Sequence, residues 1–217
     1  MGQANWADYL AWADPALVPL FSLLQAPVTP LELLAFILSL WMVACNLRVN
    51  VWGWPLAIIS SLLYGVFFAR GRLYGEASLQ LVFVAVSIWG WWQWLRPSQE
   101  ARPLESSDVH YMSKLQRLQM MALTLIAWPV MGLVLRRFTD TDVPFLDAFP
   151  TTLSLLGQYL LGRKAVENWP VWLVVNVASM GLFVYKGFWL TVVLYAVFAV
   201  LSVVGWRQWR NLTASRS

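Results

Sequence analysis

The sequence predicts an all-α integral membrane protein, with seven transmembrane helices in a 3+1+3 arrangement and two parallel three-helix repeats. The first observation behind this prediction is composition: the 217 residues are 59% hydrophobic and only 12% charged, with a mean hydropathy of +0.60. A soluble domain has about twice this charged fraction. Most of the surface of this chain must therefore face lipid. The other two observations are seven apolar segments and an internal repeat.

The seven apolar segments are candidate membrane spans. Apart from Glu32 at the start of the first segment, none contains Lys, Arg, Asp or Glu, as expected when each such charge costs about 2.5–3.5 kcal/mol at the bilayer centre. Most are long enough to cross about 30 Å of hydrocarbon. The first and fifth are short, so we expect them to extend at their N-terminal ends or to lie behind other helices. The segments are Leu31–Leu47, Trp52–Ala69, Ala77–Leu95, Leu118–Leu135, Ala148–Gly162, Trp169–Tyr185 and Gly187–Trp206.

The internal repeat is visible as an ungapped match between Leu31–Pro55 and Leu146–Pro170, in which eight of 25 positions are identical. At the same offset, Ser87, Trp91, Gln93 and Trp94 match Ser202, Trp206, Gln208 and Trp209. Chance similarity between helices rich in Leu, Val and Trp is the alternative explanation, but the constant offset favours a true repeat. Repeats in apolar chains are typical of transporters, whose substrate site lies between the two copies.

The odd fourth segment explains how the two repeats can be parallel. Three spans turn the chain over, so one further span restores the original direction before the second repeat begins. We therefore divide the chain into an N-terminal segment (1–30), repeat 1 (31–96), a polar loop (97–117), a linker transmembrane helix (118–138), repeat 2 (139–210) and a C-terminal tail (211–217). In the N-terminal segment, Asn5–Gln25 is interpreted as an interfacial amphipathic helix, with an eighth span as the alternative.

The loop charges predict the orientation. With the N-terminus outside, ten Lys and Arg residues lie on the cytoplasmic side and five on the outer side. The positive-inside rule therefore predicts an outer N-terminus and a cytoplasmic C-terminus in a bacterial inner membrane. The basic residues are scattered singly between apolar runs and form no stripe, so a nucleic-acid partner is not expected.

The sequence offers no motif for enzymatic chemistry or for an energy source. It contains no GxxxxGK[ST], HExxH or GxSxG motif. The single Cys45 excludes an intramolecular disulfide and a multi-cysteine metal site. No carboxylate lies deep in a span, so a proton relay or sodium site built on Asp or Glu is not expected. We predict no enzyme activity, cofactor or metal, and passive, facilitated transport.

Polar and aromatic side chains within the spans form the candidate substrate site. Trp169, Trp172 and Asn176 follow one helical face at spacings of three and four, so an aromatic surface lies beside an amide. This pairing suits a flat heteroaromatic ligand with hydrogen-bonding groups. The alternative for Trp169 is an anchor at the membrane interface. Thr191 and Tyr195 are spaced four apart on the last span. Gln80 lies near the middle of the third span, and buried amides need partners.

The chain resembles the PnuC family of vitamin transporters, whose type member carries nicotinamide riboside. The resemblance lies in Glu167-Asn168-Trp169-Pro170-x-Trp172, Asn176, Tyr185-Lys186-Gly187, Thr191 and Tyr195. In the first repeat it lies in Leu73-Tyr74-Gly75-Glu76, Gln80 and Gly90-Trp91-Trp92-Gln93-Trp94. It implies a SWEET-like fold, a central cavity, facilitated diffusion and trapping of the substrate by a cytoplasmic kinase. The family's motif positions fall on Gln80, Trp169, Trp172, Asn176, Lys186, Thr191 and Tyr195.

These observations favour a uniporter for nicotinamide riboside or a closely similar vitamin, in contact with the lipid bilayer. A homo-oligomer is compatible with the sequence, and functional coupling to a kinase does not require direct contact. Same-family carriers for thiamine, riboflavin or a nucleoside are alternatives. A non-transporting sensor or assembly subunit is the alternative from a different class. A sugar carrier is disfavoured by the density of tryptophan around the proposed site.

Overall fold

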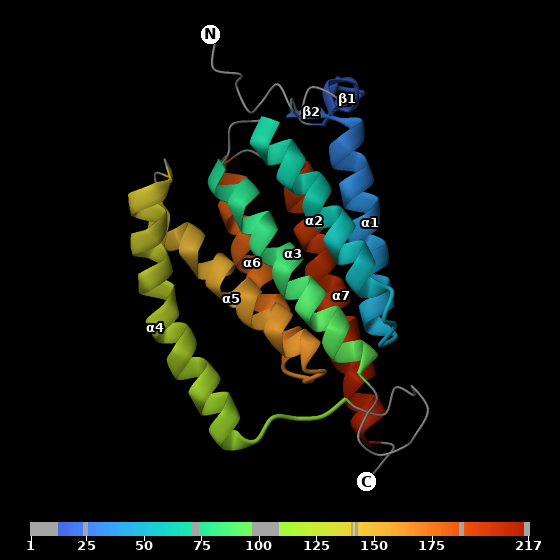
Figure 1. Ribbon diagram of the computed structural model, residues 1–217, viewed down its shortest axis with the longest axis vertical. Helices are drawn as coiled ribbons and strands as arrows, with labels where there is room; N and C mark the ends of the chain where they lie inside the picture. The colour runs from blue at the N-terminus through green and yellow to red at the C-terminus, as the bar shows by residue number, and fades with distance from the viewer. Residues whose placement is uncertain are drawn as a thin grey trace.

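In the part of the chain that it describes, the computed structural model has seven α-helices and one small hairpin (Figure 1). It describes residues 13–23, 26–70, 74–96, 109–139, 141, 143–186 and 189–214. The hairpin pairs β1 (Phe21–Leu23) with β2 (Ala26–Val28) in antiparallel fashion. The helices are α1 (Pro30–Leu47), α2 (Gly53–Arg70), α3 (Tyr74–Leu95), α4 (Lys114–Phe138), α5 (Pro144–Gly162), α6 (Asn168–Lys186) and α7 (Trp189–Ala214). All seven expected helices are confirmed.

The helices run alternately in opposite directions. In Figure 1, α1, α3, α5 and α7 descend, and α2, α4 and α6 ascend. Helix α2 packs between α1 and α3, and α6 packs between α5 and α7. The two groups meet through α3 with α5 and through α1 with α7, and α4 packs on α5 at the outer edge. Within the described residues, α1, α2, α4, α6 and α7 are long and apolar enough to cross a membrane, and α3 and α5 are less apolar.

The turns from α1 to α2 and from α5 to α6 share a left-handed residue. Val49 has φ of 52° and Lys164 has φ of 56°. In the first turn the N–H of Asn50 donates to the Cys45 carbonyl at 2.9 Å, and the corresponding bond recurs in the second. These bonds form a Schellman motif, which satisfies the last carbonyls of a helix. The left-handed position normally favours glycine. Both halves therefore adopt the same strained backbone conformation with a residue other than glycine, Val49 in one and Lys164 in the other.

Each half also packs one tryptophan against one glycine. The ring of Trp54 lies on Gly90, where an added Cβ would be 2.2 Å from the indole. At the equivalent place, Trp169 lies on Gly205, where the Cβ would be 2.5 Å away. These contacts let the second and third helices of each half approach closely. The repeat found in the sequence therefore has matching packing in the structure.

A reciprocal pair of hydrogen bonds joins the two halves. The indole N–H of Trp94 on α3 donates to the Leu161 carbonyl on α5 at 3.2 Å. The indole N–H of Trp209 on α7 donates to the Asn46 carbonyl on α1 at 3.2 Å. Each of these two rings also meets a tryptophan of its own half edge to face, with centroids 5.5 and 5.6 Å apart. The four tryptophans form the buried core at this end of the bundle.

The chain that enters α4 is fastened to the α5–α6 turn. His110 and Ala165 form a short parallel β-bridge, and Val109 is buried in the tryptophan core. Glu167 accepts hydrogen bonds from the Met112 N–H at 3.1 Å and from the Arg117 side chain at 2.9 Å. The end of the expected polar loop is therefore anchored to the second half.

Helices α4, α5 and α7 are longer than the apolar segments expected from the sequence. Helix α4 begins at Lys114, inside the expected loop 97–117, because Ser113 and Gln116 form a capping box. Helix α5 extends to Pro144, as expected for a short span. Helix α7 continues to Ala214, beyond the expected end of repeat 2 at residue 210.

The N-terminal segment differs more. The expected amphipathic helix Asn5–Gln25 lies partly outside the described residues, which begin at residue 13. Where the chain is described, residues 13–17 form a single 3₁₀ turn and Phe21–Leu23 forms β1, with no α-helix. Pro15 and Pro19 lack the N–H groups that an α-helix needs in its interior. Asp14 is instead paired with Arg70 at the end of α2.

Substitution of the two close-packed glycines tests this packing. We expect Gly90→Ala and Gly205→Ala to destabilise the protein by about 1–3 kcal/mol, because the new methyl group overlaps an indole ring. The thermal unfolding midpoint in detergent should fall by about 2–4 °C per kcal/mol. Gly181→Ala is the control, because an added Cβ there meets nothing within 4 Å. Equal midpoints for all three variants would contradict the packing.

Candidate functional site

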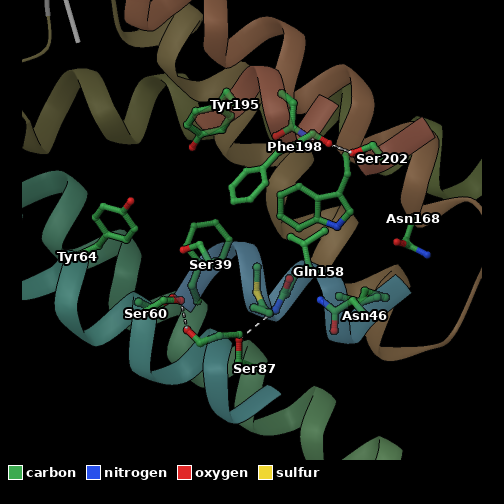
Figure 2. Close-up of a pocket in the computed structure, with 18 of the residues that line it drawn as sticks. Ser39, Asn46, Ser60, Tyr64, Ser87, Gln158, Asn168, Tyr195, Phe198 and Ser202 are labelled. Carbon is green, nitrogen blue, oxygen red and sulfur yellow. Dashed lines mark hydrogen bonds between the residues drawn. The ribbon is translucent and has the colours of Figure 1, made fainter. Parts of the chain in front are cut away.

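A cavity lies between the two halves of the bundle. Its volume is about 160 Å³, about ten times the 10–15 Å³ that one water needs. Every helix except α4 contributes to its described lining (Figure 2). The lining residues are Ser39, Met42, Val43, Asn46, Ala57, Ser60, Ser61, Tyr64, Gln80, Phe83, Ser87, Gln158, Leu161, Asn168, Trp169, Trp172, Asn176, Tyr195, Phe198 and Ser202.

Five of the seven residues expected at the site line this cavity: Gln80, Trp169, Trp172, Asn176 and Tyr195. They come from α3, α6 and α7, so the structure brings together segments far apart in the sequence. Thr191 lies one turn before Tyr195 on α7, is half-buried and is not among the described lining residues. Lys186 is the last residue of α6, and its side chain lies outside the described part of the structure.

Two amide side chains of the lining are held by equivalent serines. The Gln158 Nε2 group donates to Ser87 Oγ at 3.0 Å, which links α5 to α3 across the halves. The Asn176 Nδ2 group donates to Ser202 Oγ at 3.1 Å, which links α6 to α7. Ser202 in turn donates to the Phe198 carbonyl at 2.8 Å. An amide that donates through its nitrogen presents its carbonyl oxygen as the remaining acceptor.

The aromatic part of the lining is also positioned by its neighbours. Trp172 lies against Gly157, where an added Cβ would be 3.0 Å from the indole. Tyr195 stacks on Phe183 with centroids 5.3 Å apart and meets Phe198 edge to face at 6.2 Å. The cavity therefore combines flat apolar faces with oriented amides, as ligand sites commonly do.

The described lining of the cavity contains no Asp, Glu, Lys, Arg or His. Its polar groups are hydroxyls, amides and indole N–H groups. Such a lining can hydrogen-bond a neutral solute, and its aromatic faces attract a cation by about 0.5–2 kcal/mol. It provides no counter-charge for a buried anion, whose desolvation is expensive. The cavity therefore suits an uncharged or cationic ligand.

Several lining residues were not among the expected site residues: Ser39, Asn46, Ser60, Tyr64, Ser87, Gln158, Asn168 and Ser202. Four of them are polar side chains inside expected apolar spans, where a buried polar group needs a partner: Asn46, Ser60, Tyr64 and Gln158. The sequence does not show which face of each helix points to the cavity. Ser87 and Ser202 were visible as a matched pair of the repeat. Asn168 lies within the motif Glu167–Trp172, which drew attention to the tryptophans.

Apolar helices around a central, uncharged cavity define a helical membrane protein of the solute-transporter class. The sequence profile of the nicotinamide mononucleotide transporter family matches residues 29–211. Because this match covers most of the chain, the protein belongs to that family, which includes the PnuC vitamin transporters. The expected family membership is confirmed.

The individual relatives that the chain resembles are vitamin transporters. The chain is 28% identical over 180 residues to the riboflavin/roseoflavin transporter RibM of Streptomyces davaonensis, and this match covers 82% of this chain and 83% of that protein. It is 27% identical over 181 residues to the nicotinamide riboside transporter PnuC of Escherichia coli, across 73% and 76% of the two chains. The crystal structure of the vitamin B3 transporter PnuC shares the fold, with a TM-score of 0.75 and 21% identity, over 100% of this chain and 95% of that one.

Removal of the serine that orients Asn176 tests the polar lining. We expect Ser202→Ala to weaken ligand binding roughly fivefold, since a neutral hydrogen bond contributes about 1 kcal/mol. Binding is measured by calorimetry on the purified protein with nicotinamide riboside and with riboflavin. Thr124→Ala on α4 is the matched control, because its hydroxyl also bonds a carbonyl four residues earlier but lies away from the cavity. A loss of the same size in both variants would contradict the role of Ser202.

Proposed function

We propose that the protein takes up nicotinamide riboside, or a closely similar vitamin, by facilitated diffusion with alternating access. The observation that carries this proposal is the uncharged cavity between the halves, with an indole face and an oriented amide on α6. A pyridinium or another flat heterocycle gains dispersion and cation–π attraction from Trp172. The Asn176 amide bonds the polar groups of the ligand. A cytoplasmic kinase then retains the substrate by phosphorylation, without direct contact.

The proposed architecture is two parallel three-helix repeats joined by α4, in a 3+1+3 arrangement within the inner membrane. The equivalent tryptophan–glycine contacts and the equivalent left-handed turns of the two halves support it. Rocking of one repeat against the other exposes the cavity to each side in turn. Basic residues are in excess in the loops on the face of the membrane where the C-terminus of the chain lies. This excess supports an outer N-terminus and a cytoplasmic C-terminus.

The proposed substrate-binding residues divide by chemistry. Trp169 and Trp172 supply aromatic faces, and Gln80 and Asn176 supply amides. Tyr195 supplies a ring and a hydroxyl. Thr191 and Lys186 complete the set near the α6–α7 turn, as the family motif implies.

Riboflavin is the second candidate substrate, because a riboflavin transporter is 28% identical to this chain over most of its length. Thiamine and nucleosides are other flat, hydroxyl-bearing solutes that an aromatic–amide cavity suits. A non-transporting sensor or assembly subunit would need a closely packed interface between the halves. The cavity lined by Gln80 and Asn176 favours a carrier over that alternative.

Two substitutions test the proposed site. Trp172→Ala and Asn176→Ala should each abolish measurable vitamin binding, because they remove the aromatic face and the oriented amide. Calorimetry on folded protein in detergent is the measurement, with unfolding midpoints as the check on folding. Trp41→Ala is the control, because this side chain is 62% exposed on the outer surface of α1. Wild-type affinity in both site variants would place the substrate elsewhere.

A transport experiment tests the mechanism. Proteoliposomes that contain the protein should equilibrate labelled vitamin across the bilayer without accumulating it, because the described cavity lining holds no Asp, Glu, Lys, Arg or His for coupling. Uptake should be unchanged by an imposed proton or sodium gradient. Addition of a vitamin kinase and ATP to the lumen should convert equilibration into accumulation. Accumulation driven by an ion gradient alone would exclude facilitated diffusion.

A further inference from the structure

Three residues that line the cavity carry buried polar atoms without hydrogen-bond partners. Within the described residues, five buried side-chain nitrogen or oxygen atoms have no hydrogen bond. Three of them belong to residues that line the cavity: Asn46 Oδ1, Asn168 Oδ1 and Trp169 Nε1. These side chains are only 5%, 0% and 3% exposed. A buried polar atom without a partner costs about 1–3 kcal/mol, so these three residues are suited to receive a partner.

The three residues converge from both halves. Asn168 and Trp169 begin α6, and Asn46 lies near the end of α1. Trp209 joins them, since its indole N–H bonds the Asn46 carbonyl and its ring packs on Trp169 with centroids 5.6 Å apart. Figure 2 shows Asn46 and Asn168 at one end of the cavity and Tyr64 at the opposite end. Asn46 and Asn168 therefore lie at the same end of the cavity, and Trp169 follows Asn168 directly in the chain.

The repeat shows that each half contributes one amide here, from different positions. At the offset that separates Leu31 from Leu146, Asn168 corresponds to Gly53, and Asn46 corresponds to Leu161. In the first half the amide of Asn46 fills the space beside the glycine, where an added Cβ would be 2.1 Å from its oxygen. In the second half the amide belongs to Asn168, the first residue of α6. The α1–α2 turn and the α5–α6 turn thus each place an amide near the interface between the halves.

The unpartnered atoms define the chemistry of the missing group. The Asn168 Nδ2 group already donates to the Ala165 carbonyl at 2.6 Å, which leaves its oxygen as an acceptor. The Trp169 Nε1–H can only donate, and the Asn46 oxygen can only accept. A hydroxyl group both donates and accepts, so neighbouring hydroxyls satisfy such a mixed set. The uncharged lining disfavours a phosphate or a carboxylate.

We propose that Asn46, Asn168 and Trp169 form a polyol subsite, which binds the hydroxyl groups of a ribose ring or a ribityl chain. This inference rests on the proposed function and deepens it: the heterocycle lies against Trp172, and the sugar-derived part reaches the interface between the halves near Trp209. The subsite gives nicotinamide riboside and riboflavin a common recognition element. It also explains how one cavity can suit vitamins with different rings.

The first test removes the indole N–H donor of Trp169 but keeps an aromatic ring at that position. Trp169→Phe should weaken binding of nicotinamide riboside or of riboflavin about tenfold, as one lost hydrogen bond to a buried group predicts. Asn46→Leu, which places the residue of the second half in the first, should weaken binding to a similar extent. Trp54→Phe is the matched control: it is the counterpart of Trp169 in the repeat, is equally buried and does not line the cavity. Its affinity should stay within twofold of wild type.

Ligands without the sugar-derived part test whether the subsite binds the hydroxyl groups or the heterocycle. Lumiflavin, which lacks the ribityl chain, should bind wild type and Trp169→Phe alike, and nicotinamide should behave in the same way in the riboside arm. Equal losses in Trp169→Phe and Trp54→Phe, or a loss of lumiflavin affinity as large as that of riboflavin, would overturn the subsite.

The two proposals can fail separately. If neither vitamin binds the wild-type protein, the proposed function fails, and ribitol becomes the probe of the subsite. Protection from thermal unfolding by millimolar ribitol in wild type, reduced in Trp169→Phe, would then support the polyol subsite. An absence of protection would overturn it.

Discussion

The reciprocal hydrogen bonds of Trp94 and Trp209 are the constraint on which the rest of the structure depends. Each indole reaches across to a carbonyl near the end of the first helix of the other half. Four tryptophans then pack edge to face into one buried cluster, at the end where the chain enters α4. Because the halves are joined there by directional bonds and large apolar faces, the space beyond the cluster can remain a cavity without loosening the bundle.

The two halves share their packing more fully than they share the lining of the cavity. The glycine contacts, the left-handed turns and the Ser87–Ser202 pair recur in both halves. The cavity lining recurs only in part: Phe83 and Phe198 are an identical pair, but Trp172 and Asn176 stand where the first half has Ala57 and Ser61. Small side chains on α2 leave room that large side chains on α6 partly fill. The contacts that hold the fold are thus shared by the two halves, whereas the proposed substrate-binding residues Trp172 and Asn176 belong to the second half alone.

Much of the fold could be predicted from the sequence, because apolar segments nearly free of charge have few options in a membrane. The repeat was readable for the same reason, since Trp54-Pro55 and Trp169-Pro170 mark identical turns. The N-terminal segment was less predictable: Pro15 and Pro19 oppose the helix that its apolar pattern favours. In the cavity, Trp172 and Asn176 share a visible helical stripe, whereas Asn46 and Asn168 reach the same space from helix ends. Their convergence depends on how the halves pack, which no local pattern encodes.

The uncharged cavity lining has a consequence for the direction of flow. Taking a doubly charged phosphate ester out of water without a counter-charge is far more costly than moving the neutral or singly charged vitamin. Such a passage discriminates by the valence of the solute, and it does so equally from both sides. In the proposed mechanism, net uptake therefore needs no asymmetry in the protein, because any reaction that adds charge to the solute in one compartment prevents its return through the cavity.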